Sequence, residues 1–332
     1  METIQQLIEK ILSDGRPAVL AMIVNVEGSA YRKEGAWMLI RENDSQIGVI
    51  SGGCLESDLQ SRARKLFNTG KAEIHRYDLS AEDDLGWGRG AGCNGVVTVM
   101  IRDINSKFRR AITFLNEQLL AKNPVTFIQS MDNFDMYSFR SRNGEQYGDL
   151  DYVSQDEFSI TTPFQHIAGQ KAVGDDTVYH QLLWPMPNLY IFGAGVDARP
   201  LAQLAARVGY AVHMLDWRES LCNEVHFPKA KSFQTGNVEK LIGNITFSSL
   251  DSVVVMTHDF QKDLMIMQQL RPSRLLYFGI LGSKKRTLRL LGGEIPDWVR
   301  SPVGLSIGAD GPEEIAVSII AELIAVKRRK KI

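Results

Sequence analysis

The sequence predicts an α/β fold: a C-terminal Rossmann-like, doubly wound parallel sheet plus an N-terminal mixed α+β domain. Two observations carry the Rossmann prediction. An apolar strand at 189–192 runs into Gly193-Ala194-Gly195, and a helical pattern begins near Ala198. A second apolar strand at 211–215 ends in Asp216. This order of strand, glycine turn, helix, strand and acid is typical of a dinucleotide-binding βαβ unit.

Each residue of this motif has a physical reason. Gly193 allows the tight turn, Gly195 lets the backbone approach a phosphate, and the helix N-terminus attracts the anion. Asp216 stands where such folds hold a ribose hydroxyl. Its carboxylate favours unphosphorylated NAD because it repels a 2′-phosphate, an effect that Arg218 softens. The alternative is that the unit is architecture and holds no dinucleotide.

The length of the chain predicts two domains. A chain of 332 residues with 44% hydrophobic residues can bury two cores. We expect a first domain at 1–186 and the Rossmann-like domain at 187–332, with a hinge at Pro185-Met186-Pro187. The stretch at about 122–186 has short strand-like runs and the hairpin signal Asn143-Gly144, which predicts a β-rich completion of the first domain.

Charge and composition exclude several classes of protein. The formal net charge of −1 creates no field that favours nucleic acid or a membrane surface, so neither is an expected partner. The sequence has no apolar run of about 18 residues and no basic-then-apolar N-terminus, so we expect neither a membrane span nor a secretory signal. Three cysteines are too few for a disulfide framework, which favours reduced thiols in the cytoplasm.

A glycine-rich loop follows the third predicted strand of the N-terminal domain. Apolar runs at 18–26, 37–41 and 47–50 predict strands, and a helix is expected at 57–69. Between the last strand and the helix lies Ser51-Gly52-Gly53-Cys54-Leu55-Glu56. Its bare backbone amides predict an anion-binding shape, and the position of Cys54 near a helix N-terminus predicts a lowered thiol pKa.

The three cysteines differ in their settings. Cys93 lies in a second glycine-dense loop at 86–95, before a predicted strand at 96–101. Glycine at this density marks unusual backbone dihedrals or a close ligand, so Cys54 and Cys93 are both candidates for a functional thiolate. The alternative for each is a small buried hydrophobic residue, which is the role we expect for Cys222. A structural zinc site is not expected, because the sequence has no Cys-x-x-Cys pair.

Two further loops follow predicted strands of the Rossmann-like domain. The strand at 253–256 leads to Thr257-His258-Asp259, and the strand at 275–278 leads to a loop with Gly282 and Ser283. Because ligands gather at the carboxyl ends of parallel strands, both loops are expected to face the crevice beside the glycine turn. His258 is a candidate proton donor or ligand, or else anchors its loop by a hydrogen bond. Ser283 and the basic residues after it are candidates to hold a phosphate, or else they begin a solvated helix.

Several short segments occur in a fixed order along the chain. They are Gly28-Ser29-Ala30-Tyr31-Arg32, 51–56, Gly193-Ala194-Gly195, Thr257-His258-Asp259, 279–283, and 302–308 with Pro312-Glu313-Glu314-Ile315-Ala316. Together they resemble the XdhC/CoxI family, the xanthine dehydrogenase accessory proteins. The resemblance covers roughly residues 5–100 and 180–327. Val196, Gly311 and Asn94 stand where the family often has His, Thr and Gly.

The resemblance implies a maturation factor for molybdenum hydroxylases. Such a protein binds molybdenum cofactor (molybdopterin), helps it receive its terminal sulfur from a cysteine desulfurase, and delivers it to an apo molybdenum hydroxylase of the xanthine dehydrogenase type. The thiolates of Cys54 and Cys93 are then candidate molybdenum contacts. We expect a homodimer and a carrier without catalytic residues.

The residues expected to hold the cofactor lie in glycine-rich turns or at the carboxyl ends of predicted strands. They are Ser51, Gly52, Gly53, Cys54, Glu56, Cys93, Gly193, Gly195, Asp216, Arg218, His258, Asp259, Gly282 and Ser283.

Two alternatives stay open. The first is an NAD-dependent oxidoreductase of a small substrate, in which the crevice holds NAD(H) and His258 handles the substrate proton. The second is a scaffold that docks partners without a ligand, which leaves the glycine-rich loops unexplained. The xanthine dehydrogenase enzyme itself is excluded by counting, because its two [2Fe–2S] clusters need about eight cysteines and the chain has three.

Overall fold

The computed structural model describes residues 3–79, 95–151, 163–270 and 274–329. The chain divides into two compact units, each described by itself. Unit 1 comprises Met1–Thr161 and His166–Pro185, and unit 2 comprises Thr162–Gln165 and Met186–Ile332. None of the described helices has both the length and the apolar run that a membrane crossing needs.

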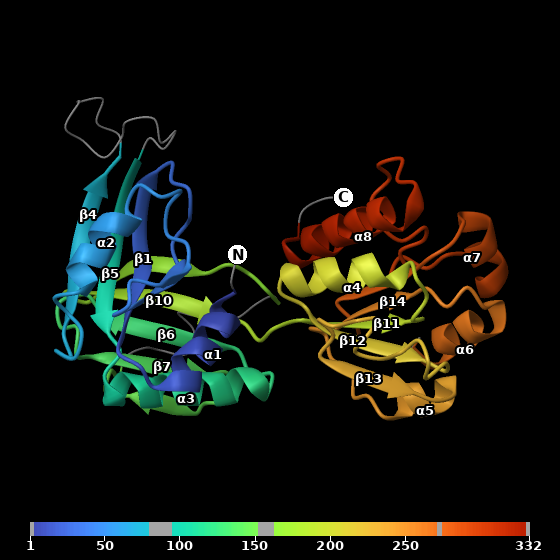
Figure 1. Ribbon diagram of the computed structural model, residues 1–332, viewed down its shortest axis with the longest axis horizontal. Helices are drawn as coiled ribbons and strands as arrows, with labels where there is room; N and C mark the ends of the chain where they lie inside the picture. Colours follow the sequence, from blue (N-terminus) through green and yellow to red (C-terminus); the bar gives the residue numbers. More distant parts are fainter. Residues whose placement is uncertain (1–2, 80–94, 152–162, 271–273, 330–332) are drawn as a thin grey trace. The chain divides into compact units, whose positions relative to one another are not determined.

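The first half of unit 1 is an antiparallel sheet with two helices (Figure 1). Its strand order is β3-β2-β1-β5-β4, so the central strand β1 pairs with β2 on one side and with β5 on the other. The elements are α1 (Ile4–Asp14), β1 (Ala18–Gly28), β2 (Trp37–Arg41), β3 (Gln46–Gly48), α2 (Glu56–Ala63), β4 (Ala72–Asp78) and β5 (Gly95–Asp103).

The second half of unit 1 repeats this topology. Its strand order is β8-β7-β6-β10-β9, with the same pattern of antiparallel neighbours. Gly48 and Gly148 end the third strand of each half with φ of 94° and 115°, and a Cβ at either position would overlap the carbonyl oxygen of Trp37 or Tyr137. The elements are α3 (Ser106–Leu120), β6 (Val125–Ser130), β7 (Tyr137–Ser141), β8 (Gln146–Gly148), β9 (Ala168–Val173) and β10 (Asp176–Leu183).

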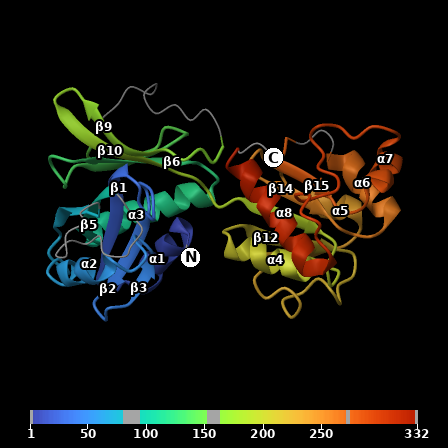
Figure 2. The same cartoon turned by 90° about the horizontal axis from the view of Figure 1, so that it is seen from above.

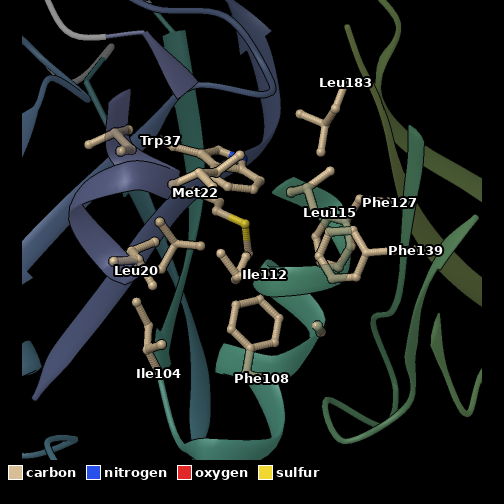
Figure 3. Close-up of a cluster of buried hydrophobic side chains, with 14 of the residues drawn as sticks. Leu20, Met22, Trp37, Ile104, Phe108, Ile112, Leu115, Phe127, Phe139 and Leu183 are labelled. Carbon is tan, nitrogen blue, oxygen red and sulfur yellow. The ribbon is translucent and has the colours of Figure 1, made fainter. Parts of the chain in front are cut away.

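The main core of unit 1 lies between its two sheets, where α1 and α3 pack (Figure 2). Figure 3 shows Met22 of β1 against Ile112 of α3, with Phe127 and Phe139 of the second sheet beyond the helix. These two rings stack with centroids 4.6 Å apart. Burial of this apolar layer on both sides of α3 holds the two halves together.

The opposite face of the first sheet is covered by α2. Leu55, Leu59 and Ala63 point into a second apolar cluster that includes Ile23 and Met38. Because the first sheet is buried on both faces, β1 is apolar over most of its length instead of alternating. The packing of Leu55 also fixes the start of α2, and with it the preceding glycine-rich loop.

Unit 2 is a Rossmann-like fold, as the sequence predicts. Its five strands are all parallel, in the order β13-β12-β11-β14-β15. The strand order reverses between β11 and β14, which is where ligands bind in folds of this kind. The strands are β11 (Asn188–Phe192), β12 (Ala211–Asp216), β13 (Ser232–Thr235), β14 (Ser252–Val255) and β15 (Tyr277–Ile280).

Helices cover both faces of this sheet. On one face α4 and α8 lie side by side (Figure 1), and their apolar residues share a cluster with β11 and β12. On the other face α5 and α6 pack against β11, β12, β14 and β15, and α7 packs beside α6. The helices are α4 (Ala198–Arg207), α5 (Val238–Gly243), α6 (Phe260–Leu270), α7 (Lys284–Leu291) and α8 (Gly311–Lys327).

Several predicted elements differ at their ends from those of the structure, and three of the differences have a local reason. The helix expected at 57–69 is α2, which ends at Ala63 because the following amides of Lys65 and Leu66 bond to carbonyls three residues back. The strand expected at 47–50 is β3, which ends at Gly48, where the backbone turns to a positive φ. The strand expected at 275–278 is β15, shifted two residues onward by its pairing with β14.

Candidate functional site

The glycine turn after β11 is held in place by close backbone packing. Gly193 has a φ of 115°, and a Cβ on it would overlap the carbonyl of Met256 just past the end of β14. Its amide donates to the carbonyl of Leu215 in β12 at 2.8 Å. The turn is therefore wedged between the ends of both neighbouring strands, and only glycine fits there.

Asp216 is fully engaged within the chain. One carboxylate oxygen accepts from the amide of Ala194 at 2.6 Å and from Nη2 of Arg218 at 2.7 Å. The other accepts from the amide and Nε of Arg218 at 2.8 and 2.9 Å. Burial alone would raise the pKa of Asp216, but these hydrogen bonds outweigh it and hold the pKa below its usual value. A ribose hydroxyl would have to compete with Arg218 for this carboxylate.

A second carboxylate lies at the N-terminus of α4. Oδ2 of Asp197 is 2.5 Å from Nε2 of His258, whose backbone is left-handed at a φ of 58°. A Cβ on Gly195 would lie 2.5 Å from Oδ1 of Asp197. The contact between His258 and Asp197 thus joins the loop after β14 to the segment that follows the glycine turn. A carboxylate of the chain therefore lies at the helix end where a phosphate was expected, but it makes no capping hydrogen bond to the helix amides.

Ser283 has a local role in the structure. Its hydroxyl accepts from the amide of Arg286 at 3.3 Å and so caps α7, after Gly282 with its φ of 133°. Arg286 in turn pairs with the buried carboxylate of Asp263 at 2.6 Å, which also accepts from the hydroxyl of Thr257. In the described part of the chain, Ser283 makes no hydrogen bond to the glycine turn.

Two residues at the carboxyl edge of the unit 2 sheet were missed by sequence reasoning. The half-buried Trp217 directly follows Asp216, and the guanidinium of Arg218 lies 4.6 Å from its ring centroid. The ammonium of Lys262, in the first turn of α6, lies 4.1 Å from the same centroid and 2.6 Å from a carboxylate oxygen of Asp259. The position of Trp217 directly after Asp216 could have indicated an aromatic side chain at this edge of the sheet.

The glycine-rich loop of unit 1 is filled by a side chain of its own. The amides of Ser51 and Gly53 donate to the two carboxylate oxygens of Glu56 at 2.7 and 3.1 Å. The hydroxyl of Ser51 also donates to Glu56 and accepts from the amide of Leu55 at 3.0 Å. Two of the amides that were expected to be bare, those of Ser51 and Gly53, therefore already hold an anion. Burial would raise the pKa of Glu56, but these donors lower it below its usual value.

Three sequence motifs meet at one end of the first sheet. Cys54 is half-buried and packs against the cluster under α2. A Cβ on Gly52 would lie 3.9 Å from the half-exposed ring of Tyr31, and Gly95 packs against the backbone of Ser29. Cys93 lies outside the described residues, as does most of its loop. Cys222 is buried in unit 2, in the packing role expected of it.

Metal ligands do not gather anywhere in the described ranges: no group of three His, Cys, Asp or Glu residues there could hold an ion. Cys54 is accordingly one thiol beside apolar neighbours. The described residues around it offer no partners for a resident metal site.

Removal of the Glu56 carboxylate is expected to loosen the loop at 51–55. Glu56→Gln loses the charged acceptor for two amides, so alkylation of Cys54 under native conditions should accelerate about fivefold or more. Mass spectrometry of the peptide that contains Cys54 measures this rate. Glu73→Gln, on the exposed edge of β4, serves as the control and should leave the rate unchanged. An unchanged rate in Glu56→Gln would mean that Glu56 does not hold the loop.

Family comparisons define the class of protein. The XdhC Rossmann domain matches residues 189–323, and the XdhC and CoxI family matches residues 11–78. The first match runs from β11 through most of α8, and the second runs from the last turn of α1 through β4. The chain belongs to the XdhC and CoxI family.

Individual relatives match the whole chain. A Bacillus subtilis (strain 168) protein, named as a probable xanthine dehydrogenase subunit, is 39% identical over 99% of both chains. The Escherichia coli (strain K12) molybdenum cofactor insertion chaperone PaoD is 26% identical over 98% of this chain and 88% of its own. A Bacillus halodurans crystal structure, described as a xanthine dehydrogenase, is 37% identical with a TM-score of 0.88, over 99% of this chain and 97% of that one.

Proposed function

We propose that this chain is a maturation factor that binds molybdenum cofactor, assists its sulfuration, and inserts it into an apo molybdenum hydroxylase of the xanthine dehydrogenase type. The observation that carries the proposal is similarity along nearly the whole chain to a molybdenum cofactor insertion chaperone, within one family. The sulfur would come from a cysteine desulfurase. We further propose that the protein works in the cytoplasm as a homodimer and that its two domains are residues 1–186 and 187–332.

The chemistry of the side chains fits this cargo. Molybdenum cofactor combines a pterin ring, a phosphate and a metal bound through sulfur. In unit 2, Trp217 offers an aromatic face, and Arg218 and Lys262 offer charged N–H donors. In unit 1, Cys54 offers a thiol, which is a ligand type suited to soft metal centres. The backbone of the glycine turn at Gly193 and Gly195 is a further candidate for contact with the cargo within unit 2.

The commitment of Asp216 favours a carrier over a dehydrogenase. A hydride-transfer enzyme needs a nicotinamide dinucleotide beside a group that manages the substrate proton. Here the ribose acceptor is already bonded to Arg218 and Ala194, and the candidate proton donor His258 is paired with Asp197. A carrier needs neither group free, because it moves an intact cofactor by affinity rather than turnover.

Activation of an apoenzyme tests the proposal. The full-length protein, added with molybdenum cofactor and a sulfur donor, is expected to raise the active fraction of an apo molybdenum hydroxylase severalfold over an equal amount of albumin. The same protein alone should produce no NADH from purines or small alcohols. Robust NADH production without any activation would overturn the carrier function and favour the oxidoreductase.

The cysteines can be tested separately. Cys54→Ser is expected to lower retention of molybdenum cofactor about tenfold or more, because a hydroxyl is a poor substitute for a thiolate at a soft metal centre. Retained molybdenum and pterin are measured by metal analysis and mass spectrometry after gel filtration. Cys222→Ser is the control, since Cys222 is buried in unit 2. Wild-type retention in both Cys54→Ser and Cys93→Ser would contradict the thiolate role.

A further inference from the structure

Trp217 lies at the ligand-binding edge of the unit 2 sheet. It follows the last residue of β12, and Lys262 comes from the helix that follows β14. The contact between the Lys262 ammonium and the Trp217 ring, at 4.1 Å, therefore joins the carboxyl ends of two strands that flank β11. Ligands of open parallel sheets bind at this edge, beside the reversal of strand order.

Both cations at the ring are paired with carboxylates and still have N–H donors that are not used. Asp216 fixes Arg218 through Nε and Nη2, and within the described residues Nη1 makes no hydrogen bond. Asp259 fixes Lys262 through one bond at 2.6 Å, which leaves two of its three N–H donors. The side chains of Arg218 and Lys262 are 39% and 29% exposed, so an arriving ligand can reach these donors.

The Trp217 indole and the two cations together favour one class of ligand, an aromatic ring that carries an anionic group. A planar heteroaromatic ring can stack on the half-buried indole in place of the ammonium, and the displaced ammonium then meets an anionic group on the same ligand. A ribose diol finds no acceptor at the neighbouring acid, since all four bonds to Asp216 come from the chain itself. These constraints favour a ring whose phosphate is carried without a ribose.

We propose that Trp217 is the stacking face for the pterin ring of the cargo, and that Arg218 and Lys262 bind its phosphate. This inference rests on the proposed function and gives it a specific recognition site. Stacking requires Lys262 to leave the indole, while Asp216 keeps Arg218 in position. Trp217 thus selects ligands with a planar aromatic ring, and the two cations select ligands that carry a negative charge.

Binding of a stable probe tests this site in the full-length protein. The probes are a pterin with a phosphorylated side chain and the same pterin without phosphate, followed by quenching of pterin fluorescence and by calorimetry. Trp217→Leu is expected to raise the Kd of the phosphorylated pterin about tenfold or more, and Trp217→Phe less than about threefold. Trp298→Phe is the matched control: this indole of unit 2 is 38% exposed and contacts Phe278.

The cations have a separate signature. Lys262→Met and Arg218→Gln are expected to raise the Kd of the phosphorylated pterin about fivefold or more, and neither should raise the Kd of the unphosphorylated pterin more than about twofold. The effects of these two variants on the Kd values of the two pterins can be measured even if Trp217→Leu does not fold. Circular dichroism and thermal melting establish the folded state of each variant.

Several results would overturn the site. They are wild-type affinity in a folded Trp217→Leu variant, an equal loss in Trp298→Phe, tighter binding of adenosine monophosphate than of the phosphorylated pterin, or no binding of that pterin by the wild type. Apoenzyme activation separates this failure from failure of the proposed function. If the wild type activates the apoenzyme and Trp217→Leu does not change the Kd of the phosphorylated pterin, only the proposed recognition site is wrong.

Discussion

Gly193→Ala is expected to destabilise unit 2 by about 3 kcal/mol or more, whereas Gly195→Ala should cost less than about 1 kcal/mol. A methyl group on Gly193 meets the backbone carbonyl of Met256, which cannot move without displacing the end of β14, and the φ of 115° is strained for alanine. A methyl group on Gly195 meets only the carboxylate end of Asp197, which can rotate away. The two glycines of one motif therefore have separate roles.

Native-state hydrogen exchange measures this difference within unit 2, which matters because a two-domain chain need not unfold in one step. The amide of Met256, bonded to the carbonyl of Phe192 at 2.8 Å, reports the junction of β11 and β14 directly. Its opening free energy should fall in Gly193→Ala and hold near the wild-type value in Gly195→Ala. Equal losses in the two variants would show that the backbone contact at Gly193 is not decisive.

Asp216→Asn is the second substitution with a large expected effect, a loss of about 3 kcal/mol. The asparagine keeps the shape but removes the charge that pairs with Arg218, and at least one oxygen that accepts an amide becomes a donor group. The loss is no larger because the guanidinium is 39% exposed and solvent screens its attraction to the carboxylate. Arg218→Gln should cost less, since the buried carboxylate keeps both backbone donors.

The pH dependence of stability supplies a separate check. Because the folded-state pKa of Asp216 is lowered, its contribution to stability is complete above the unfolded pKa of about 3.9 and is lost as the pH falls through the folded value. Between about pH 5 and pH 3, the wild type should lose stability more steeply than Asp216→Asn. Melting temperatures across that range measure the slopes, and parallel slopes would contradict the role of Asp216.

The Rossmann-like unit was predictable because its signals are local. The glycine turn, the small Ala198 and the acid at Asp216 each follow from backbone geometry within one βαβ segment. Strand β13 was missed, since Ser232–Thr235 is four half-buried residues without an apolar pattern. Strand β4 alternates only weakly and lies at an edge, where its burial depends on β5. Such short elements are set by their neighbours.

Candidate site residues were predictable in position but not in partner. The sequence locates Asp216 and Glu56 in the correct turns, but it does not show that Arg218 would bond the first or that Ser51 would bond the second. The side chains of residues that are close in sequence can point toward or away from one another, and the fold determines which of the two occurs. The stacking of Lys262 on Trp217 depends on the spacing of two strands, which no local pattern encodes. The cofactor role of these residues stays a prediction.

The internal carboxylates also bear on competition from abundant small anions. Glu56 occupies the amides of Ser51 and Gly53, and Asp216 occupies the amide of Ala194. If such amides are free about one time in a hundred, the apparent affinity of any ligand that needs them falls about a hundredfold. Free phosphate, which can make few contacts beyond these amides, would then bind negligibly at millimolar concentrations. A cargo that makes several further contacts at once offsets this loss of affinity. It can therefore be bound even when it is much scarcer than free phosphate.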